Sequence, residues 1–380
     1  MRVLHVITGL NVGGAETMLY KIICDLSEKN VESKVITLTD IGKIGRKLEA
    51  MGIPVTALGM KRGIPGPKGM VLLIRHIKKY KPDVIQSWMY HADLLAGLAG
   101  RLGGKYPVIW NIRHSNLEPE TNKKLTIFTA KLCARLSESL PTKIICCSEA
   151  SRREHLKLGY TEHKMTVIPN GFDTKQYQPD EVVRIETRKE LEIDQETLVV
   201  GIVGRYDRQK DFPNFINAAK IISKKRKKIN FVMVGRDIDE NNKELIHLIR
   251  EAGIAEDVRL LGERDEIWRL ICSFDIATSA SKSGEGFSNS IGEAMSCGVP
   301  CVVTDVGDSG IIVGDTGKVV KSGDASELAY AWEQLIEEGD EGRRERGDKA
   351  RKRIIAEYSI ATIAERYKKL YYEVTERVWN

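Results

Sequence analysis

Residues 275–305 read DIATSASKSGEGFSNSIGEAMSCGVPCVVTD, and this stretch decides the fold class. The segments DIATSAS and PCVVTD are short and apolar, as buried strands are. Between them, FSNSIGEAMSCG has helical spacing and ends at a glycine, Gly298. A strand, a helix and a second strand in this order form a βαβ unit, whose two strands lie parallel in one sheet.

The same alternation of strands and helices runs through both halves of the chain. In the first half we expect strands at 2–8, 33–40, 53–59, 83–88, 107–115 and 143–148, with helices at 15–26, 43–51, 67–80, 91–102 and 125–137. In the second half we expect further strands at 197–205, 229–236, 258–263 and 317–320. A turn-rich segment at 167–180, VIPNGFDTKQYQPD, separates the halves. We therefore predict an α/β protein with two Rossmann-like, doubly wound domains, at 1–172 and 173–357, that face a central cleft.

Composition excludes several classes of protein. The 380 residues are 42% hydrophobic and 29% charged, and no apolar run approaches the roughly 18 residues that span a bilayer. The N-terminal MRVLHVITGLNVGG lacks a small-residue cleavage site, so we interpret it as a strand rather than a signal peptide. The seven cysteines include no CxxC pair, which favours free thiols over a disulfide or zinc framework. These features predict a cytoplasmic protein.

Charge is divided unevenly along the chain. Residues 1–170 carry 26 Lys and Arg against 14 Asp and Glu, whereas the remainder carries 33 against 39. A basic first half suggests an anionic partner, with ordinary solvated lysines as the alternative. The helix at 123–136 has both an apolar face and basic residues. Such a helix either lies on an anionic membrane or packs its apolar face against the core, with its lysines in solvent. Its apolar face comprises Leu125, Phe128, Leu132 and Leu136, and its basic residues are Lys123, Lys124, Lys131 and Arg135.

Two short segments have the residues of a phosphate site. The loop TGLNVGGAET, after the first strand, contains Gly13 and Gly14, which allow a tight turn and a close approach of the backbone to a ligand. A plain tight turn is the alternative, and Asp40 at the end of the second strand leaves a dinucleotide site open as well. In GRYDRQKDF, Arg205 and Lys210 follow a strand and can clamp a diphosphate, unless both are ordinary surface charges.

Glu285 precedes the helix of the opening stretch, and Glu293 lies within it. Since cations and helix amides would hold the phosphates, these carboxylates are available to accept hydrogen bonds from hydroxyl groups. A ligand with two sets of hydroxyls and a diphosphate between them is a nucleotide sugar. The alternative for either glutamate alone is a structural or surface acid.

The motifs together resemble the retaining GT-B glycosyltransferases of family four. The E-x7-E motif from Glu285 to Glu293 carries the resemblance, and NVGGAET, VIPNGFD, GRYDRQKDF, FVMVGRD and GDTGKVV extend it over the whole chain. The resemblance implies transfer of a sugar from a nucleoside diphosphate sugar, based on uridine or guanosine, to an acceptor. It also implies a C-terminal helix, 358–380, that returns to the N-terminal acceptor-binding domain, while the second domain binds the donor.

The resemblance assigns roles residue by residue. Arg205 and Lys210 match the pair on the donor diphosphate. Glu285 matches the acid on the donor-sugar hydroxyls, and Glu293 the acid on the ribose. The remaining matches are His114 near the donor sugar, Gly13 and Gly14 near the phosphate or acceptor, Gly235 near the base, and the amides of Gly286, Phe287 and Ser288 beside Glu285. Two positions depart from the family pattern: Asp237 replaces a frequent glycine and Ser288 a frequent Pro or Gly.

Two further candidates are less specific. His91 follows a strand and either lines the site as a catalytic residue or packs at a helix start. The acids of DID at 237–239 match a metal-binding DxD of another glycosyltransferase fold, but they fall outside that context. We therefore expect a metal-independent reaction without a cofactor, in which cations and amide dipoles stabilise the departing diphosphate.

These features predict an enzyme that makes cell-surface polysaccharide or glycolipid, with a sugar or lipid-linked acceptor, contact with the inner face of the cell membrane and no nucleic-acid partner. Three alternatives stay open. They are a hydrolysing sugar-nucleotide epimerase, which would need no acceptor, an NAD(P)-dependent oxidoreductase, and a two-domain sugar-binding protein without turnover.

Overall fold

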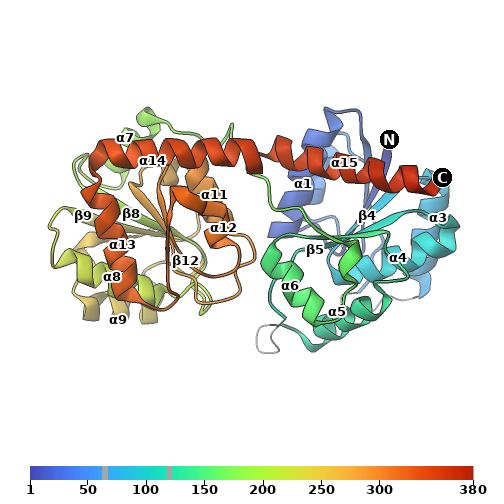
Figure 1. Ribbon diagram of the computed structural model, residues 1–380, viewed down its shortest axis with the longest axis horizontal. Coiled ribbons are helices and arrows are strands. Elements are labelled where there is room, and N and C mark those ends of the chain that lie inside the picture. Colours follow the sequence, from blue (N-terminus) through green and yellow to red (C-terminus); the bar gives the residue numbers. More distant parts are fainter. Residues whose placement is uncertain (62–66, 118–121, 380) are drawn as a thin grey trace. The chain divides into compact units, whose positions relative to one another are not determined.

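A computed structural model describes residues 1–61, 67–117 and 122–379. The chain divides into two compact units, the first formed by Met1–Gly171 with Ile360–Asn380 and the second by Phe172–Ser359 (Figure 1). The boundaries expected from the sequence, after residues 172 and 357, lie within two residues of this division. Each unit is an α/β structure built on one parallel sheet, as predicted.

The first unit contains a seven-stranded sheet of order β3-β2-β1-β4-β5-β6-β7. All its strand pairs are parallel. The strands are β1 (Arg2–Ile7), β2 (Glu32–Thr37), β3 (Val55–Ala57), β4 (Val84–Trp88), β5 (Val108–Ile112), β6 (Lys143–Cys146) and β7 (Met165–Val167). The order reverses between β1 and β4, which makes their carboxyl ends the switch point of this sheet. The short β7 was not expected, because it merges with the turn-rich junction.

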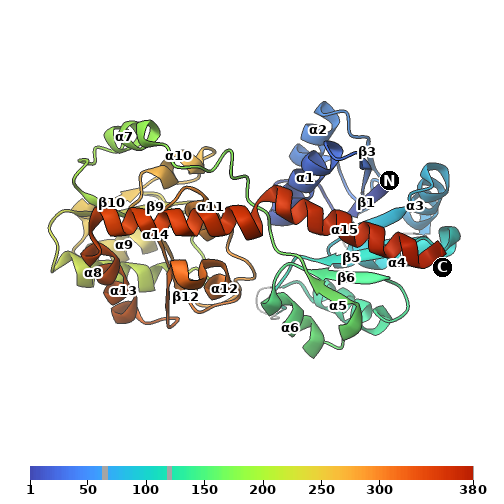
Figure 2. The ribbon, with the colours of Figure 1, turned by 45° about the horizontal axis from the view of Figure 1, so that its top comes forward.

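Helices cover both faces of the first sheet. The helices are α1 (Gly14–Ser27), α2 (Gly42–Ala50), α3 (Pro67–Tyr80), α4 (Tyr90–Gly104), α5 (Lys124–Leu136), α6 (Glu149–Lys157) and α15 (Ile360–Trp379). One apolar core joins the sheet to α1, α2 and α15, and the other joins it to α3, α4 and α5. The C-terminal helix α15 lies along α1, as Figure 2 shows. The helix α6 was not predicted.

The second unit contains a six-stranded parallel sheet of order β10-β9-β8-β11-β12-β13. Its strands are β8 (Leu198–Val203), β9 (Ile229–Val234), β10 (Val258–Leu260), β11 (Ile276–Ser279), β12 (Cys301–Thr304) and β13 (Lys318–Val320). Here the order reverses between β8 and β11. The opening stretch of the sequence therefore supplies one of the two strands that flank the switch point.

The helices of the second unit also form two layers. They are α7 (Glu181–Glu190), α8 (Phe212–Ser223), α9 (Lys243–Ala252), α10 (Ile267–Cys272), α11 (Asn289–Ser296), α12 (Ser309–Val313), α13 (Ala325–Glu337) and α14 (Gly339–Arg353). One core packs α8, α9 and α13 on the sheet, and the other packs α7, α10, α11, α12 and α14. A π-helical turn, Ile354–Tyr358, leads from α14 towards α15. None of the helices, over the described residues, is both long and apolar enough to cross a bilayer.

Candidate functional site

Lys210 and Glu285 meet at the switch point of the second sheet. Lys210 follows β8 and Glu285 follows β11, and these two strands are parallel neighbours. The Lys210 Nζ lies 2.6 Å from Glu285 Oε2, and the Ser281 hydroxyl donates to the same oxygen at 3.0 Å. Both partners therefore use Oε2 and neither uses Oε1. Ser281, which the sequence analysis did not single out, is the last residue of DIATSAS and follows β11.

The Glu285 carboxylate is held in its ionised form. Burial of this side chain, which is 10% exposed, raises the pKa of the carboxyl. The Lys210 ammonium and the side chains of Ser281 and Ser288 outweigh that effect, so the pKa of Glu285 lies below its usual value. A buried, charged acceptor beside a cation fits recognition of a polar ligand.

Three loops hold Glu285 in place. The backbone N–H of Lys282 donates to the carbonyl of Gln209 at 2.7 Å, which ties the loop after β11 to the loop after β8. Gly307, after β12, has φ of 63°, and a Cβ there would lie 1.8 Å from the carbonyl oxygen of Glu285. The loops can approach this closely only because position 307 is a glycine.

The segment Gly286–Ser288 leads into α11 with its backbone N–H groups unused. In the described part of the chain these three groups have no acceptor. The Phe287 side chain is buried, 5.9 Å between ring centroids from Phe172 and 5.5 Å from Tyr358. The apolar anchor thus fixes the loop while its amides remain available to an anion at the helix N-terminus.

Arg205 lies apart from the Lys210–Glu285 pair. Its guanidinium is 55% exposed, with Nε 3.1 Å from Asp207 Oδ2 and Nη2 3.4 Å from Gln209 Oε1. Lys210 is instead 23% exposed. The two cations of the expected clamp therefore differ in exposure, and the clamp on a diphosphate stays a prediction.

Glu293 lies within α11, half-buried, where the Tyr177 hydroxyl faces it. Burial raises the pKa of Tyr177 well above its usual range, and the charge of Glu293 and the hydrogen bond to it add to this effect. Tyr177 lies in the turn-rich junction, and no sequence signal linked it to Glu293.

Gly235 joins the loops after β8 and β9. Its φ is 143°, and a Cβ there would lie 2.0 Å from the carbonyl oxygen of Gly204. Tyr206 N–H donates to the Arg236 carbonyl at 2.8 Å beside it. The structure therefore gives Gly235 a packing reason to be glycine, and its role near a base stays a prediction.

The glycine loop of the first unit follows β1, at that sheet's switch point. Gly13 caps α1 and the exposed Gly14 begins it. The Asn11 side chain of the same loop donates to Asp40 Oδ1 at 3.2 Å. Asp40, on which the dinucleotide alternative depended, is thus a partner of the loop itself.

The two candidate histidines differ in their surroundings. His114 follows β5 and is exposed, and partial desolvation of the ring lowers its pKa below the usual value. His91 lies in the first turn of α4 and is half-buried, with Nε2 3.5 Å from the Thr129 hydroxyl of α5. That contact favours the packing interpretation of His91 over a catalytic one.

The helix α5 turns only the C-terminal part of its apolar stripe to the core. Its buried residues are Thr129, Ala130, Cys133 and Ala134. Leu125 is 41% exposed and Phe128 is 63% exposed, and the basic Lys124, Lys131 and Arg135 are exposed around them. The apolar stripe is therefore divided. Leu132 is half-buried and Leu136 packs on the core, whereas Leu125 and Phe128 are exposed, so neither alternative describes the whole helix.

The DID segment makes local hydrogen bonds. Asp239 accepts the N–H of Asn241 at 2.8 Å, and the Asp237 carbonyl accepts the Asn242 side chain at 2.7 Å. No group of three metal-ligating side chains occurs in 1–61, 67–117 and 122–379. The expected metal independence remains a prediction.

Comparison with known proteins now adds to the geometry. The family model described as Glycosyltransferase Family 4 matches residues 12–176, and that described as Glycosyl transferases group 1 matches residues 183–353. The chain is 26% identical over 65% of its length to an Escherichia coli UDP-Gal:alpha-D-GlcNAc-diphosphoundecaprenol alpha-1,3-galactosyltransferase, and the match spans 64% of that relative. It is 25% identical over 97% of its length to an N,N'-diacetylbacillosaminyl-diphospho-undecaprenol alpha-1,3-N-acetylgalactosaminyltransferase of Campylobacter jejuni, covering 99% of that relative.

Solved structures share the fold over almost the whole chain. The Anabaena protein HepE in complex with UDP superimposes with a TM-score of 0.85 at 23% identity, covering 98% of this chain and all of that one. A sucrose-phosphate synthase from Thermosynechococcus elongatus gives a TM-score of 0.78 at 17% identity, over 99% of this chain and all of that one. The two family matches and these GT-B neighbours agree with the two parallel sheets of this chain. They also agree with the position of Glu285, the first acid of the E-x7-E motif, at the switch point of the second sheet. The chain therefore belongs to the GT-B glycosyltransferases of family four.

Proposed function

We propose that this glycosyltransferase moves a sugar from a uridine diphosphate sugar to a lipid-linked acceptor, with retention of the anomeric configuration, in the synthesis of a cell-surface polysaccharide or glycolipid. The observation that carries the donor assignment is the Lys210–Glu285 pair at the switch point of the second sheet. Only one oxygen of Glu285 is engaged by Lys210 and Ser281, so the other can accept a sugar hydroxyl.

The chemistry follows from the charges around this pair. The amides of Gly286–Ser288 and the ammonium of Lys210 favour negative charge, which develops on the diphosphate as it leaves. Lys210 would turn from Glu285 towards the phosphate while Glu285 holds the sugar. We infer a front-side displacement through an oxocarbenium-like state, in which the leaving phosphate takes the acceptor's proton. His114 would approach the sugar, and Glu293 would bind the ribose in exchange for its contact with Tyr177.

Uridine is the first base to test, because the Escherichia coli relative is named for UDP-Gal and HepE was solved with UDP and with UDP-glucose. Isothermal titration with UDP and GDP, followed by transfer assays with the common sugars of the preferred base, tests the donor. The anomeric configuration of the product, read from its proton couplings, tests retention. Product of inverted configuration would contradict the mechanism, and hydrolysis without any acceptor would favour an epimerase-like enzyme.

The acceptor proposal rests on α5. Two of the relatives are named for diphosphoundecaprenol acceptors, which are lipids. An exposed apolar stripe of Leu125 and Phe128 beside Lys124, Lys131 and Arg135 is the pattern of a helix that lies on an anionic membrane surface. The helix would hold the enzyme beside such an acceptor at the cytoplasmic face of the membrane.

Sedimentation with anionic vesicles tests this surface. Replacing Lys124, Lys131 and Arg135 with Gln should release the protein from the vesicles, since each basic residue contributes ~1 kcal/mol near an anionic surface. The matched control replaces Lys224, Lys227 and Lys228 of the second unit with Gln, which removes the same charge from exposed positions. Equal loss of binding in both variants would mean net charge alone governs binding, and no binding by the wild type at low salt would overturn the membrane proposal. UDP affinity should not change in either variant.

A further inference from the structure

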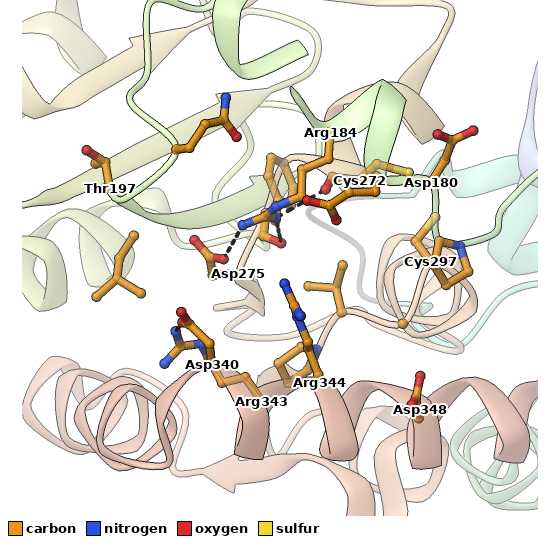
Figure 3. A pocket seen from close by; sticks show the side chains of 18 of the residues that line it. Asp180, Arg184, Thr197, Cys272, Asp275, Cys297, Asp340, Arg343, Arg344 and Asp348 are labelled. Atoms are coloured by element: carbon orange, nitrogen blue, oxygen red, sulfur yellow. Dashed lines mark hydrogen bonds and ion pairs between the residues drawn. The ribbon is translucent and has the colours of Figure 1, made fainter. Parts of the chain in front are cut away.

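A pocket of about 700 Å³ lies at the amino ends of strands in the second sheet (Figure 3). Lys210 and Glu285 lie beyond the carboxyl ends of the strands. Thr197, Asp275 and Pro300 line the pocket, and these residues directly precede β8, β11 and β12. The amino ends of three strands thus border this pocket, whereas Glu285 follows the carboxyl end of β11. The donor site does not account for it.

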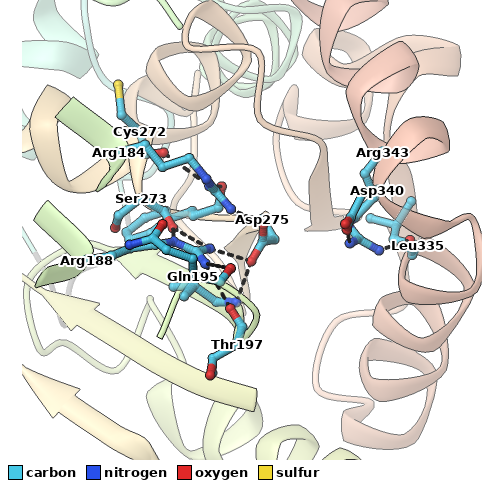
Figure 4. Close-up of polar contacts among 12 residues, drawn as sticks. Arg184, Arg188, Gln195, Thr197, Cys272, Ser273, Asp275, Leu335, Asp340 and Arg343 are labelled. Carbon is cyan, nitrogen blue, oxygen red and sulfur yellow. Dashed lines mark hydrogen bonds and ion pairs between the residues drawn. The ribbon is translucent and has the colours of Figure 1, made fainter. Parts of the chain in front are cut away.

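Three arginines of this region have protein acceptors. Arg184 pairs with Asp275 Oδ1 at 2.6 Å and Arg188 with Oδ2 at 2.7 Å, and Figure 4 shows both arginines around this one carboxylate. Arg343 donates to the carbonyls of Leu335 and Ile336. These contacts tie α7 to the start of β11 and α14 to the end of α13.

Two thiols are the reactive groups of the pocket. Cys272 is the last residue of α10 and Cys297 is the C-cap of α11, and these helices are in contact. Both cysteines are free and both line the pocket, where Figure 3 shows their side chains near each other. They are only 6% and 5% exposed, so the pocket is their route to solvent.

The two thiols differ in acidity. The interaction with Cys297 is the largest cause that lowers the pKa of Cys272, whose thiol also lies 3.4 Å from the Gln178 carbonyl. The same interaction and burial raise the pKa of Cys297. An unequal pair of this kind has an attacking thiolate and a resolving thiol.

We propose that Cys272 and Cys297 form a reversible disulfide that clamps α10 to α11. A small-molecule disulfide is the oxidant. The Cys272 thiolate attacks one of its sulfurs and releases the first small thiol, which takes up a proton. Cys297 then attacks the mixed disulfide, loses its own proton and releases the second small thiol, so that two protein thiols are oxidised and one external disulfide is reduced.

Peptide mapping of the native full chain tests the link. Reduced protein is treated with glutathione disulfide, remaining thiols are alkylated, and the protein is digested with trypsin. Trypsin cleaves after Lys282, between the two cysteines, so the disulfide should join peptide 270–282 to peptide 283–318. The linked species should disappear on reduction. A native protein that gains glutathione on the half-buried Cys24 but never yields this linked species would overturn the proposal.

Variants assign the partner. Cys301 shares the second peptide but lies on β12 and is buried without lining the pocket, so Cys301→Ser should keep the link. Cys297→Ser should lose it and accumulate glutathione on Cys272, which traps the intermediate. A link that survives in Cys297→Ser and vanishes in Cys301→Ser would show that the wrong pair was assigned.

Stability gives a second readout without any substitution. The disulfide closes a loop within the second unit, so the oxidised wild type should unfold at a Tm roughly 5–10 °C above that of the reduced protein, reversibly. Oxidised Cys297→Ser should show no such shift. A linked protein that unfolds at a lower Tm would mean that α10 and α11 must move apart to form the bond, and the clamp would be rejected.

Discussion

Each sheet has a carboxyl group near the carboxyl ends of its central strands, and the two groups have opposite electrostatic surroundings. Asp93 lies in α4, just after β4, and is 1% exposed. Its Oδ1 accepts hydrogen bonds from the Ser87 hydroxyl at 2.6 Å and the Asn111 N–H at 3.2 Å. Glu285, after β11, instead pairs with a lysine.

This difference decides what each carboxyl can do. Burial raises the pKa of Asp93 to about 7, against the two hydrogen bonds that lower it, and its Oδ2 has no partner in the described chain. The pKa of Glu285 is lowered because Lys210 more than offsets its burial. A buried carboxyl without a cation nearby is readily protonated and serves as a structural group. A buried carboxyl paired with a cation stays ionised and can accept hydrogen bonds from a ligand.

The largest expected effect is the pH dependence of stability from Asp93. Its folded pKa, about 7, exceeds the unfolded value of 3.8, so the folded state retains the proton longer. The raised pKa therefore adds about 4 kcal/mol to the free energy of unfolding below about pH 4, and this gain is lost as the pH rises through about 7. Asp93→Asn imitates the protonated group, since its amide would occupy the unpartnered Oδ2 position.

Urea unfolding across this pH range measures the effect. Asp93→Asn and the wild type should match in stability at low pH, and the variant should be the more stable above neutrality. A constant difference between them at all pH values would contradict the raised pKa and weaken the contrast with Glu285.

Glu285→Gln should lower sugar transfer by about 10- to 100-fold, equivalent to ~1.5–3 kcal/mol for a hydrogen bond to a charged group. The affinity for UDP alone should be almost unchanged, because this acid is assigned to the sugar. Glu333→Gln is the matched control, since Glu333 also pairs with a lysine, Lys225, at 2.7 Å. Transfer kinetics and UDP titration provide the measurements, and the idea fails if both variants lose activity equally.

Lys210→Ala and Arg205→Ala test the unequal cations. Both should weaken UDP binding, the first by ~1.5–3 kcal/mol and the exposed Arg205 by ~1 kcal/mol or less. Titration at low and high salt separates them, because screening should reduce the Arg205 effect more. Unchanged UDP affinity in both variants would remove the diphosphate assignment.

The smallest effect is expected for Glu293→Gln, which should weaken UDP binding by ~1 kcal/mol, since the amide oxygen can still accept a ribose hydroxyl. The same titration with UDP and without a sugar measures it. Loss of transfer with intact UDP affinity would show that the roles of Glu293 and Glu285 are exchanged.

The sequence alone determined the fold class and the family, because both depend on local patterns. Strand and helix spacing predicts two parallel sheets, and the E-x7-E motif with its companion segments carries the family resemblance. The strand boundaries were less accurate: β7 was absorbed into the turn-rich junction, and β2 ends at Thr37 rather than at Asp40.

The pairing of charges depends on how the chain folds in three dimensions. Lys210 and Glu285 are separated by 75 residues and meet only because β8 and β11 are neighbours in the sheet. The exposure of Phe128 likewise depends on small residues of α5 filling the core, which helical spacing cannot distinguish from the opposite orientation. Local patterns encode periodicity, whereas burial and charge pairing depend on contacts between distant segments, and those contacts set the pKa of each carboxyl.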